Sequence, residues 1–130
     1  MKFTICTKAN QRVHGVRDWS ELFNLCKTYT VIRAREGKRL LGQIAVEIDE
    51  NNNAWIFFLS VDPDERGNGI GTQLIDKAET FVEKSGIENI YLRPQKEFEK
   101  RLVPWYESLG YEKLERDPTC RNEWLMCKNI

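Results

Sequence analysis

Three glycines stand at alternate positions, Gly67, Gly69 and Gly71, in the stretch DERGNGIGTQL (residues 64–74), directly ahead of a run with helical periodicity. The start of a helix offers backbone N–H groups without partners and the positive end of the helix dipole, a combination suited to phosphate. Glycine lets the backbone approach such a ligand closely because it has no Cβ. Arg66 adds a fixed positive charge beside the loop. The pattern therefore predicts a pyrophosphate cradle built from main-chain amides.

Two common phosphate motifs are excluded. The P-loop needs Gly-Lys-Ser/Thr, whereas Gly71 is followed by Thr72 without a lysine. The dinucleotide fingerprint needs a glycine three residues after Gly69, where this chain has Thr72. What remains is Arg-x-x-Gly-x-Gly, beginning at Arg66. A plain turn with a helix cap is the alternative, and the position between a buried strand and an amphipathic helix favours the ligand site.

The pattern of apolar residues predicts the strands and the helix that position this loop. Residues 54–61, AWIFFLSV, are apolar nearly throughout and predict a central strand buried on both faces. After the glycines, apolar residues at helical spacing predict an amphipathic helix that ends at Gly86: Leu74, Ile75, Ala78, Phe81 and Val82. A further strand follows at 88–94, so the loop lies in a strand–helix–strand unit.

The flanking elements complete a mixed α/β chain. Strands are expected at 2–7, 29–35 and 39–49, and a helix at 18–29. Downstream, a short helix is expected over 104–110, with Pro104 in its first turn and Gly110 at its C-cap, followed by strands at 111–116 and 122–128.

The length and the net charge of the chain limit the number of domains and the classes of function to be expected. The chain has 130 residues, so a single domain over 1–130 is expected. Twenty Lys and Arg balance twenty Asp and Glu, and a chain without net charge lacks the field that holds a nucleic-acid backbone. No apolar run reaches membrane-spanning length, and the N-terminus lacks a secretory pattern. We therefore expect a cytoplasmic protein that binds neither nucleic acid nor membrane.

The cysteines and the one histidine argue against a metal site. Cys6, Cys26, Cys120 and Cys127 form no CxxC pair, and His14 is the only histidine. Free thiols are expected, and no metal.

The stretch FLSVDPDERGNGIGTQLID (58–76) resembles the acetyl-CoA motif of the GNAT family of N-acetyltransferases. PWYESLGYEK (104–113) and the closing WLMCK (124–128) are similar to later segments of that family, so the resemblance runs from Val31 to the C-terminus. It implies a mixed, mostly antiparallel sheet flanked by helices. It also implies that strand 54–61 bulges and splays from strand 88–94 at the cofactor site.

The resemblance assigns acetyl-CoA to the glycine loop. Backbone groups of Leu59, Ser60 and Val61 would bind the pantetheine arm, and an N–H near Leu59 would stabilise the oxyanion. The main chain that would hold the pyrophosphate runs from Arg66 to Thr72, comprising Arg66, Gly67, Asn68, Gly69, Ile70, Gly71 and Thr72.

Tyr106 matches the family tyrosine that protonates the departing CoA thiolate. With reference pKa values of roughly 10 for tyrosine and 8.5 for a thiol, the phenol is mostly protonated at neutral pH and has a proton to donate. The alternative is an aromatic core residue. Trp105, Leu109 and Tyr111 are interpreted as packing residues.

The sequence does not identify the general base that would accept the proton of the amine. Strand 54–61 carries no acid, which departs from the family pattern, and Glu47 on the mixed face of the preceding strand is the best nearby candidate. A solvated strand glutamate, a water chain and His14 are the alternatives.

Two further departures concern the cofactor and the acceptor. Glu99 and Leu102 stand where the family often has Asn and Ala, and Pro104 is expected to prevent one continuous helix over 93–106, so no CoA contact is assigned there. The N-terminal part is short, so the acceptor pocket is either open or completed by a second subunit in a homodimer.

The resemblance implies an acetyl-CoA-dependent N-acetyltransferase that moves an acetyl group to a primary amine by direct transfer in a ternary complex. The amine belongs to a small molecule, a peptide or a protein. No cysteine has the neighbours of a nucleophile, which argues against an acetyl-enzyme. A non-catalytic CoA- or acyl-CoA-binding sensor or interaction module is the alternative.

Overall fold

The computed structural model of the chain describes residues 1–6 and 30–130. The helix expected over 18–29 lies outside these described residues, and so do His14 and Cys26. Within the part that is described, no helix has the length and apolar character needed to cross a membrane.

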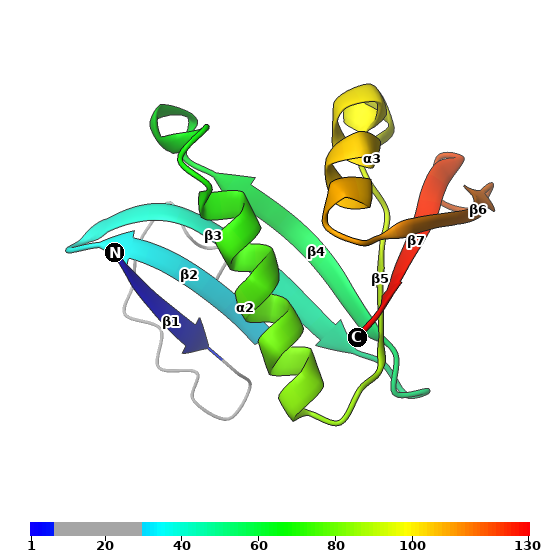
Figure 1. Cartoon of the computed structure of the whole chain (residues 1–130), viewed down its shortest axis with the longest axis horizontal. Helices are drawn as coiled ribbons and strands as arrows, with labels where there is room; N and C mark the ends of the chain where they lie inside the picture. Colours follow the sequence, from blue (N-terminus) through cyan, green and yellow to red (C-terminus); the bar gives the residue numbers. More distant parts are fainter. Residues whose placement is uncertain (7–29) are drawn as a thin grey trace. The chain divides into compact units, whose positions relative to one another are not determined.

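In the described residues four strands come first, a helix–strand–helix stretch follows, and two strands close the chain (Figure 1). The strands are β1 (Lys2–Cys6), β2 (Thr30–Glu36), β3 (Arg39–Ile48), β4 (Ala54–Val61), β5 (Asn89–Leu92), β6 (Glu112–Asp117) and β7 (Glu123–Asn129). The helices are the short 3-10 turns η3 (Pro63–Glu65) and η4 (Lys96–Phe98) and the α-helices α2 (Ile70–Lys84) and α3 (Glu99–Ser108).

The strands form a seven-stranded sheet in the order β1-β2-β3-β4-β5-β7-β6. The β1–β2, β2–β3, β5–β7 and β6–β7 pairs are antiparallel, and β4 pairs with β5 in parallel. The expected mixed, mostly antiparallel sheet is therefore confirmed, and β4 is a central strand as predicted.

Two compact units make up the chain, and each is described by itself. The first comprises residues 1–47 and 56–81, and the second comprises residues 48–55 and 82–130. The prediction of a single domain stays a prediction.

In the first unit, α2 runs across one face of the antiparallel strands β2 and β3 (Figure 1). Its apolar stripe is buried while residues such as Asp76 and Lys77 stay exposed, as expected for an amphipathic helix on a sheet. The fully or nearly fully buried residues of this unit are Val31, Ile32, Ala34, Leu41, Ile44, Ala45, Val46, Ile56, Ile70, Leu74, Ile75 and Ala78.

In the second unit, β7 pairs with β5 on one side and with β6 on the other. Its core residues are Ala54, Val82, Ile87, Ile90, Leu92, Val103, Tyr106, Tyr111 and Met126. The start of α3 is fixed by a bidentate pair in which the Arg116 guanidinium donates to Glu99 at 2.7 and 3.0 Å. This pair lowers the pKa of Glu99, because the Arg116 hydrogen bond favours the carboxylate. Glu99 thus has a structural partner.

Both helices end as predicted, on a glycine. Gly86 (φ 77°) and Gly110 (φ 99°) adopt the left-handed backbone that side chains disfavour. Gly86 N–H donates to Glu83, and Ile87 N–H donates to Val82. The same pair of bonds closes α3 at Gly110, which gives both helices a Schellman cap.

The predicted bounds of the last helix are wrong. α3 begins at Glu99 and runs through Pro104 to Ser108. Segment 93–106 is interrupted as expected, but the break lies at Phe98 (φ −115°, ψ 10°), where the 3-10 turn meets the helix, and not at the proline. Proline removes only one helical hydrogen bond here, and burial of Val103 and Tyr106 on either side holds the helix together.

Candidate cofactor-binding site

The first turn of α2 presents free backbone donors. The first helical hydrogen bond runs from Gln73 N–H to the Gly69 carbonyl at 3.0 Å, and α2 begins at Ile70. The helix therefore starts within the glycine loop, one residue before Gly71, and not after all three glycines as predicted. The N–H groups of residues 69–72 make no hydrogen bond to any residue in the described ranges. These are the unpaired donors of a helix start, and the loop that carries them is exposed. Such a turn can bind an anion.

Two of the three glycines are required by the backbone. Gly67 (φ 88°) and Gly69 (φ 77°) are left-handed, and a Cβ added at either position would meet nothing within 4 Å. Backbone conformation, and not crowding, therefore selects glycine at these two positions. Gly71 lies inside α2 and does not have a positive φ.

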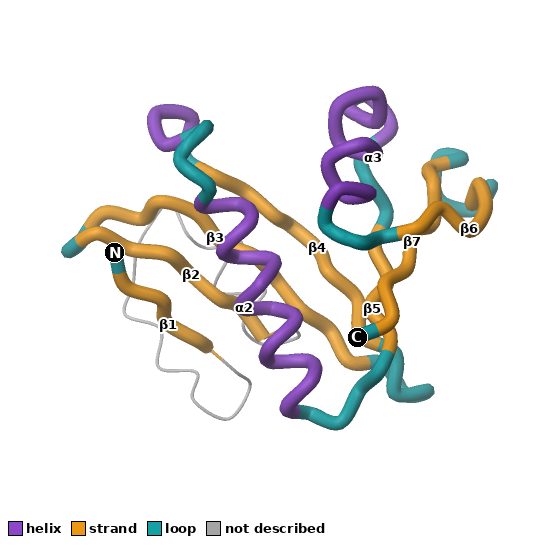
Figure 2. Tube along the Cα trace, in the orientation of Figure 1, coloured by secondary structure: helices purple, strands orange, loops and turns teal. Residues whose placement is uncertain are grey.

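The turn that follows β4 passes through η3 before it enters α2 (Figure 2), and a backbone hydrogen bond joins it to β3. Asp62 N–H donates to the Leu41 carbonyl at 2.7 Å. The Asp62 carboxylate caps η3 by accepting from Asp64 N–H at 2.9 Å, with Pro63 in the first turn. This chemistry fixes where the chain leaves β4.

The second half of β4 departs from the prediction of a strand buried on both faces. Ala54 and Ile56 are buried, but Phe58 is 55% exposed and Ser60 is exposed as well. Phe58 has a φ of 54°, a rare and strained value for a bulky residue, and this breaks the alternation of the strand. An irregularity in this strand is what the family resemblance implies.

The parallel pairing of β4 with β5 is limited to Ala54–Ile90 and Trp55–Tyr91, at the start of β4. Leu59, Ser60 and Val61 follow the irregular residue and are partly or fully exposed. Binding of the pantetheine arm by the backbone of these three residues stays a prediction. The splaying of β4 from β5 at the cofactor site stays a prediction as well.

The two arginines near the loop are used differently. Arg66 is exposed and forms no ion pair with a described residue, so its charge is available beside the free amides. Arg39, at the start of β3, is paired with Asp62 at 3.5 Å and with Glu65 at 3.0 Å.

Glu47 lies near the end of β3 and is half-buried. The expected alternation of a buried apolar face and a mixed face is incomplete in β3. Ala45, expected on the mixed face, is 1% exposed, whereas Ile48, expected on the apolar face, is 38% exposed. The structure brings Glu47 into the same compact unit as the glycine loop. Its role as a base stays a prediction.

Tyr106 belongs to the second unit, on α3. The residue is 6% exposed, and its ring contacts Trp105 (centroids 4.9 Å apart) and Tyr111 (5.8 Å, edge to face). Burial raises the pKa of Tyr106 to about 12, so the phenol stays protonated at neutral pH. Tyr111, at 1% exposure, is a packing residue as expected.

The described residues contain no cluster of three or more His, Cys, Asp or Glu side chains that could hold a metal. Cys6, Cys120 and Cys127 are reduced, in agreement with the prediction for these three.

Sequence reasoning missed two residues of this site. Arg39 looks like an ordinary turn arginine, and its partners follow it by more than twenty positions. Gly42 looks like a glycine that weakens a strand, but in the structure a Cβ at this position would lie 2.8 Å from the carbonyl oxygen of Ser60. The only advance signal was the concentration of three acids, Asp62, Asp64 and Glu65, directly before an expected anion site.

The family model for the acetyltransferase (GNAT) family matches residues 4–111, which is most of the chain. The chain belongs to the GNAT acetyltransferase family.

Among curated relatives of this GNAT chain, an uncharacterized N-acetyltransferase of Methanocaldococcus jannaschii is 40% identical over 68 residues, covering 52% of this chain and 30% of the relative. A histone acetyltransferase of Glycine max is 35% identical over 77 residues, covering 59% of this chain and 32% of the relative. The GNAT chain thus spans about a third of the length of these curated relatives.

Solved structures show the same fold over the whole chain. PaiA N-acetyltransferase of Thermoplasma acidophilum, solved in complex with coenzyme A, superposes with a TM-score of 0.73 at 17% identity and covers 100% of both chains. At this identity the likeness establishes the GNAT fold.

Proposed function

We propose that this GNAT chain is an acetyl-CoA-dependent N-acetyltransferase that transfers the acetyl group directly to a primary amine. The observation that carries the proposal is the set of free N–H donors at residues 69–72, presented by two left-handed glycines at the start of α2. A neutral ligand would gain little from this array, whereas a pyrophosphate is matched to it. Arg66 supplies an unpaired positive charge at the same place.

The pantetheine arm would continue along residues 59–61. An extended chain of amides can pair with exposed backbone groups as an added strand does. The positive φ of Phe58 interrupts the regular strand conformation directly before residues 59–61. A backbone N–H near Leu59 would then donate to the thioester carbonyl oxygen as negative charge develops.

The transfer requires two proton movements. The neutral amine attacks the carbonyl carbon of the thioester, the carbon–sulfur bond breaks, and the sulfur leaves with the bonding pair. The hydroxyl of Tyr106, which is protonated at neutral pH because burial raises its pKa to about 12, would give its proton to the sulfur, and the resulting phenolate would regain a proton from water. The proton lost by the amine would pass to Glu47 or to water.

The acceptor amine and the assembly stay open in this proposal. The relatives that we compare include a histone acetyltransferase, so a protein acceptor belongs in any screen beside small amines. A cytoplasmic location and a homodimer that completes the acceptor pocket are further predictions.

The test measures CoA release with a thiol reagent against a panel of amines, peptides and cell protein, with acetyl-CoA binding by calorimetry. We expect binding together with amine-dependent turnover. Binding without turnover on any acceptor would favour the sensor over the enzyme, and no binding would overturn the proposed function.

A further inference from the structure

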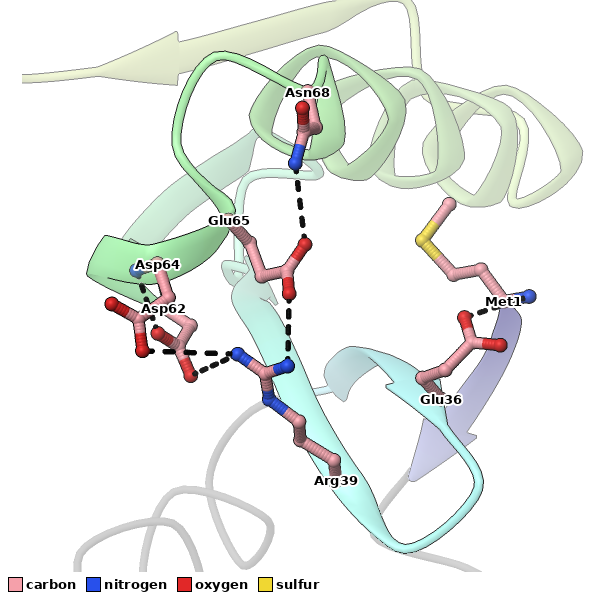
Figure 3. Close-up of polar contacts among 7 residues, drawn as sticks. All are labelled: Met1, Glu36, Arg39, Asp62, Asp64, Glu65 and Asn68. Carbon is pink, nitrogen blue, oxygen red and sulfur yellow. Dashed lines mark hydrogen bonds and ion pairs between the residues drawn. The ribbon is translucent and has the colours of Figure 1, made fainter.

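Three carboxylates precede the glycine loop, and one guanidinium holds them. Arg39 Nη1 lies 3.0 Å from Glu65 Oε1, and Arg39 Nη2 lies 3.5 Å from Asp62 Oδ2 and 4.0 Å from Asp64 Oδ2 (Figure 3). The planar fork of arginine can serve two carboxylates at once, which a lysine ammonium cannot match. One residue of β3 therefore contacts all three acidic side chains of the turn.

Glu65 passes this constraint on to the loop. Its second oxygen, Oε2, accepts from Asn68 Nδ2 at 3.3 Å, and the Asn68 N–H donates to the Glu65 carbonyl at 3.4 Å. Asn68 lies between the two left-handed glycines, Gly67 and Gly69. Arg39 is thus connected through Glu65 to the residue at the centre of the glycine loop (Figure 3).

A second attachment lies two residues further along β3. Leu41 accepts from Asp62 N–H at 2.7 Å, so β3 holds the segment at both Arg39 and Leu41. A glycine loop is entropically free unless it is tied down, and ordering it when a ligand binds would weaken binding. The two attachments order it in advance.

Charge gives Arg39 a second effect. Without it, Asp62, Asp64 and Glu65 would place three uncompensated negative charges beside the site proposed for a pyrophosphate. Glu65 is the most significant of the three, because its side chain is 21% exposed and is screened less than that of Asp64, at 87%.

We propose that Arg39 is a positioning residue of the cofactor site, which acts through Glu65 and Asn68 to hold the pyrophosphate-binding amides in their binding geometry. The inference rests on the proposed function. It concerns binding of the pyrophosphate and not the chemistry at the thioester.

The first experiment compares Arg39→Gln with Lys38→Gln. Both variants lose one positive charge from adjacent positions, but Lys38 is exposed and forms no ion pair with a described residue. We expect Arg39→Gln to raise the Kd for CoA and the KM for acetyl-CoA by about 10-fold or more, with kcat within about 2-fold. Lys38→Gln should change neither by more than about 2-fold. Arg39→Lys should fall between them, since it keeps the charge but loses the fork.

A shortened acetyl donor distinguishes a positioning role of Arg39 from a general disturbance of the fold. Acetyl-pantetheine lacks the pyrophosphate, so Arg39→Gln should use it as well as the wild-type protein does. An equal loss with both donors would mean that the substitution disturbs the fold, and would overturn the proposal. Thermal unfolding of each variant, followed by circular dichroism, checks the same point.

A second pair of variants separates structure from simple charge. Glu65→Gln and Asp64→Asn each remove one negative charge near the site. If the carboxylates acted only by repelling phosphate, both variants would bind CoA more tightly. We expect Asp64→Asn to bind slightly more tightly and Glu65→Gln to bind several-fold more weakly, because the latter breaks the pair with Arg39.

The outcomes distinguish the two proposals. A wild-type protein that fails to bind CoA would overturn the proposed function and this inference with it. A wild-type protein that binds CoA, with Arg39→Gln indistinguishable from Lys38→Gln, would overturn the positioning role alone.

Discussion

Gly42 on β3 faces the carbonyl oxygen of Ser60 on β4 so closely that a Cβ at Gly42 would lie 2.8 Å from that oxygen. The same Cβ would lie 3.1 Å from Leu74 Cδ1 and 3.4 Å from Ile70 Cγ2 on α2. The absence of a side chain at one position thus sets how near the strand and the helix of the proposed cofactor site approach β3. Backbone atoms cannot move aside as a flexible side chain can.

Gly42→Ala should therefore lower the free energy of unfolding by roughly 1–3 kcal/mol through overpacking and weaken CoA binding by shifting Ser60. Denaturant unfolding and calorimetry measure the two effects. Gly37→Ala is the control, because Gly37 has open space around it and only a left-handed φ of 59°. It should cost stability through backbone strain without altering CoA affinity, and an equal loss of affinity in both variants would contradict the account of Gly42.

Gly69→Ala should weaken CoA binding by about 10-fold or more, because alanine disfavours left-handed φ by roughly 1–2 kcal/mol and would re-orient the free amides. Gly86→Ala is a close match, since Gly86 has the same φ of 77° and equally open surroundings. We expect both variants to lose similar stability in thermal melts, and only Gly69→Ala to lose CoA affinity in calorimetry.

Tyr106→Phe should lower kcat by about 100-fold, the lower end of what general acid catalysis contributes, and leave the Kd for CoA nearly unchanged. Steady-state kinetics with calorimetry measure both quantities. Tyr111→Phe removes a hydroxyl from a neighbouring buried ring and should retain kcat. An unchanged kcat in Tyr106→Phe would remove this residue from the mechanism.

The raised pKa of Tyr106 also predicts alkaline instability. The folded state holds this proton up to about pH 12, whereas an unfolded tyrosine releases it near pH 10. The stabilising contribution is therefore complete below pH 10 and is lost as the pH rises through 12, and it amounts to roughly 3 kcal/mol. Urea unfolding between pH 9 and about 12 should show a steeper loss in the wild-type protein than in Tyr106→Phe. Parallel curves would contradict the burial of the phenol.

Glu47→Gln tests the general base. If the carboxylate accepts the amine proton, the variant should lose the acidic limb of the pH–rate profile and most of kcat at neutral pH. Glu50→Gln, an exposed neighbour in the following turn, is the control. A profile that Glu47→Gln leaves unaltered would assign the proton to water.

The sequence by itself determined the helix of the glycine loop, the caps at Gly86 and Gly110, and the family. These features depend on local chemistry, because helical spacing, left-handed glycines and a helix start involve residues that lie close together in the sequence. The order of the motifs along the chain then predicted the fold, including the central position of strand 54–61 in the sheet.

Only the tertiary structure decided the features that depend on residues far apart in the chain. The continuation of α3 through Pro104 depends on burial on both sides of the proline, which local propensity cannot register. The exposure of Phe58 comes from a backbone irregularity in a strand whose composition indicated full burial. Arg39 and Gly42 lie near the loop only because β3 runs beside β4 and the turn that follows it. That proximity is created by pairing and packing across the fold and not by any pattern in either segment.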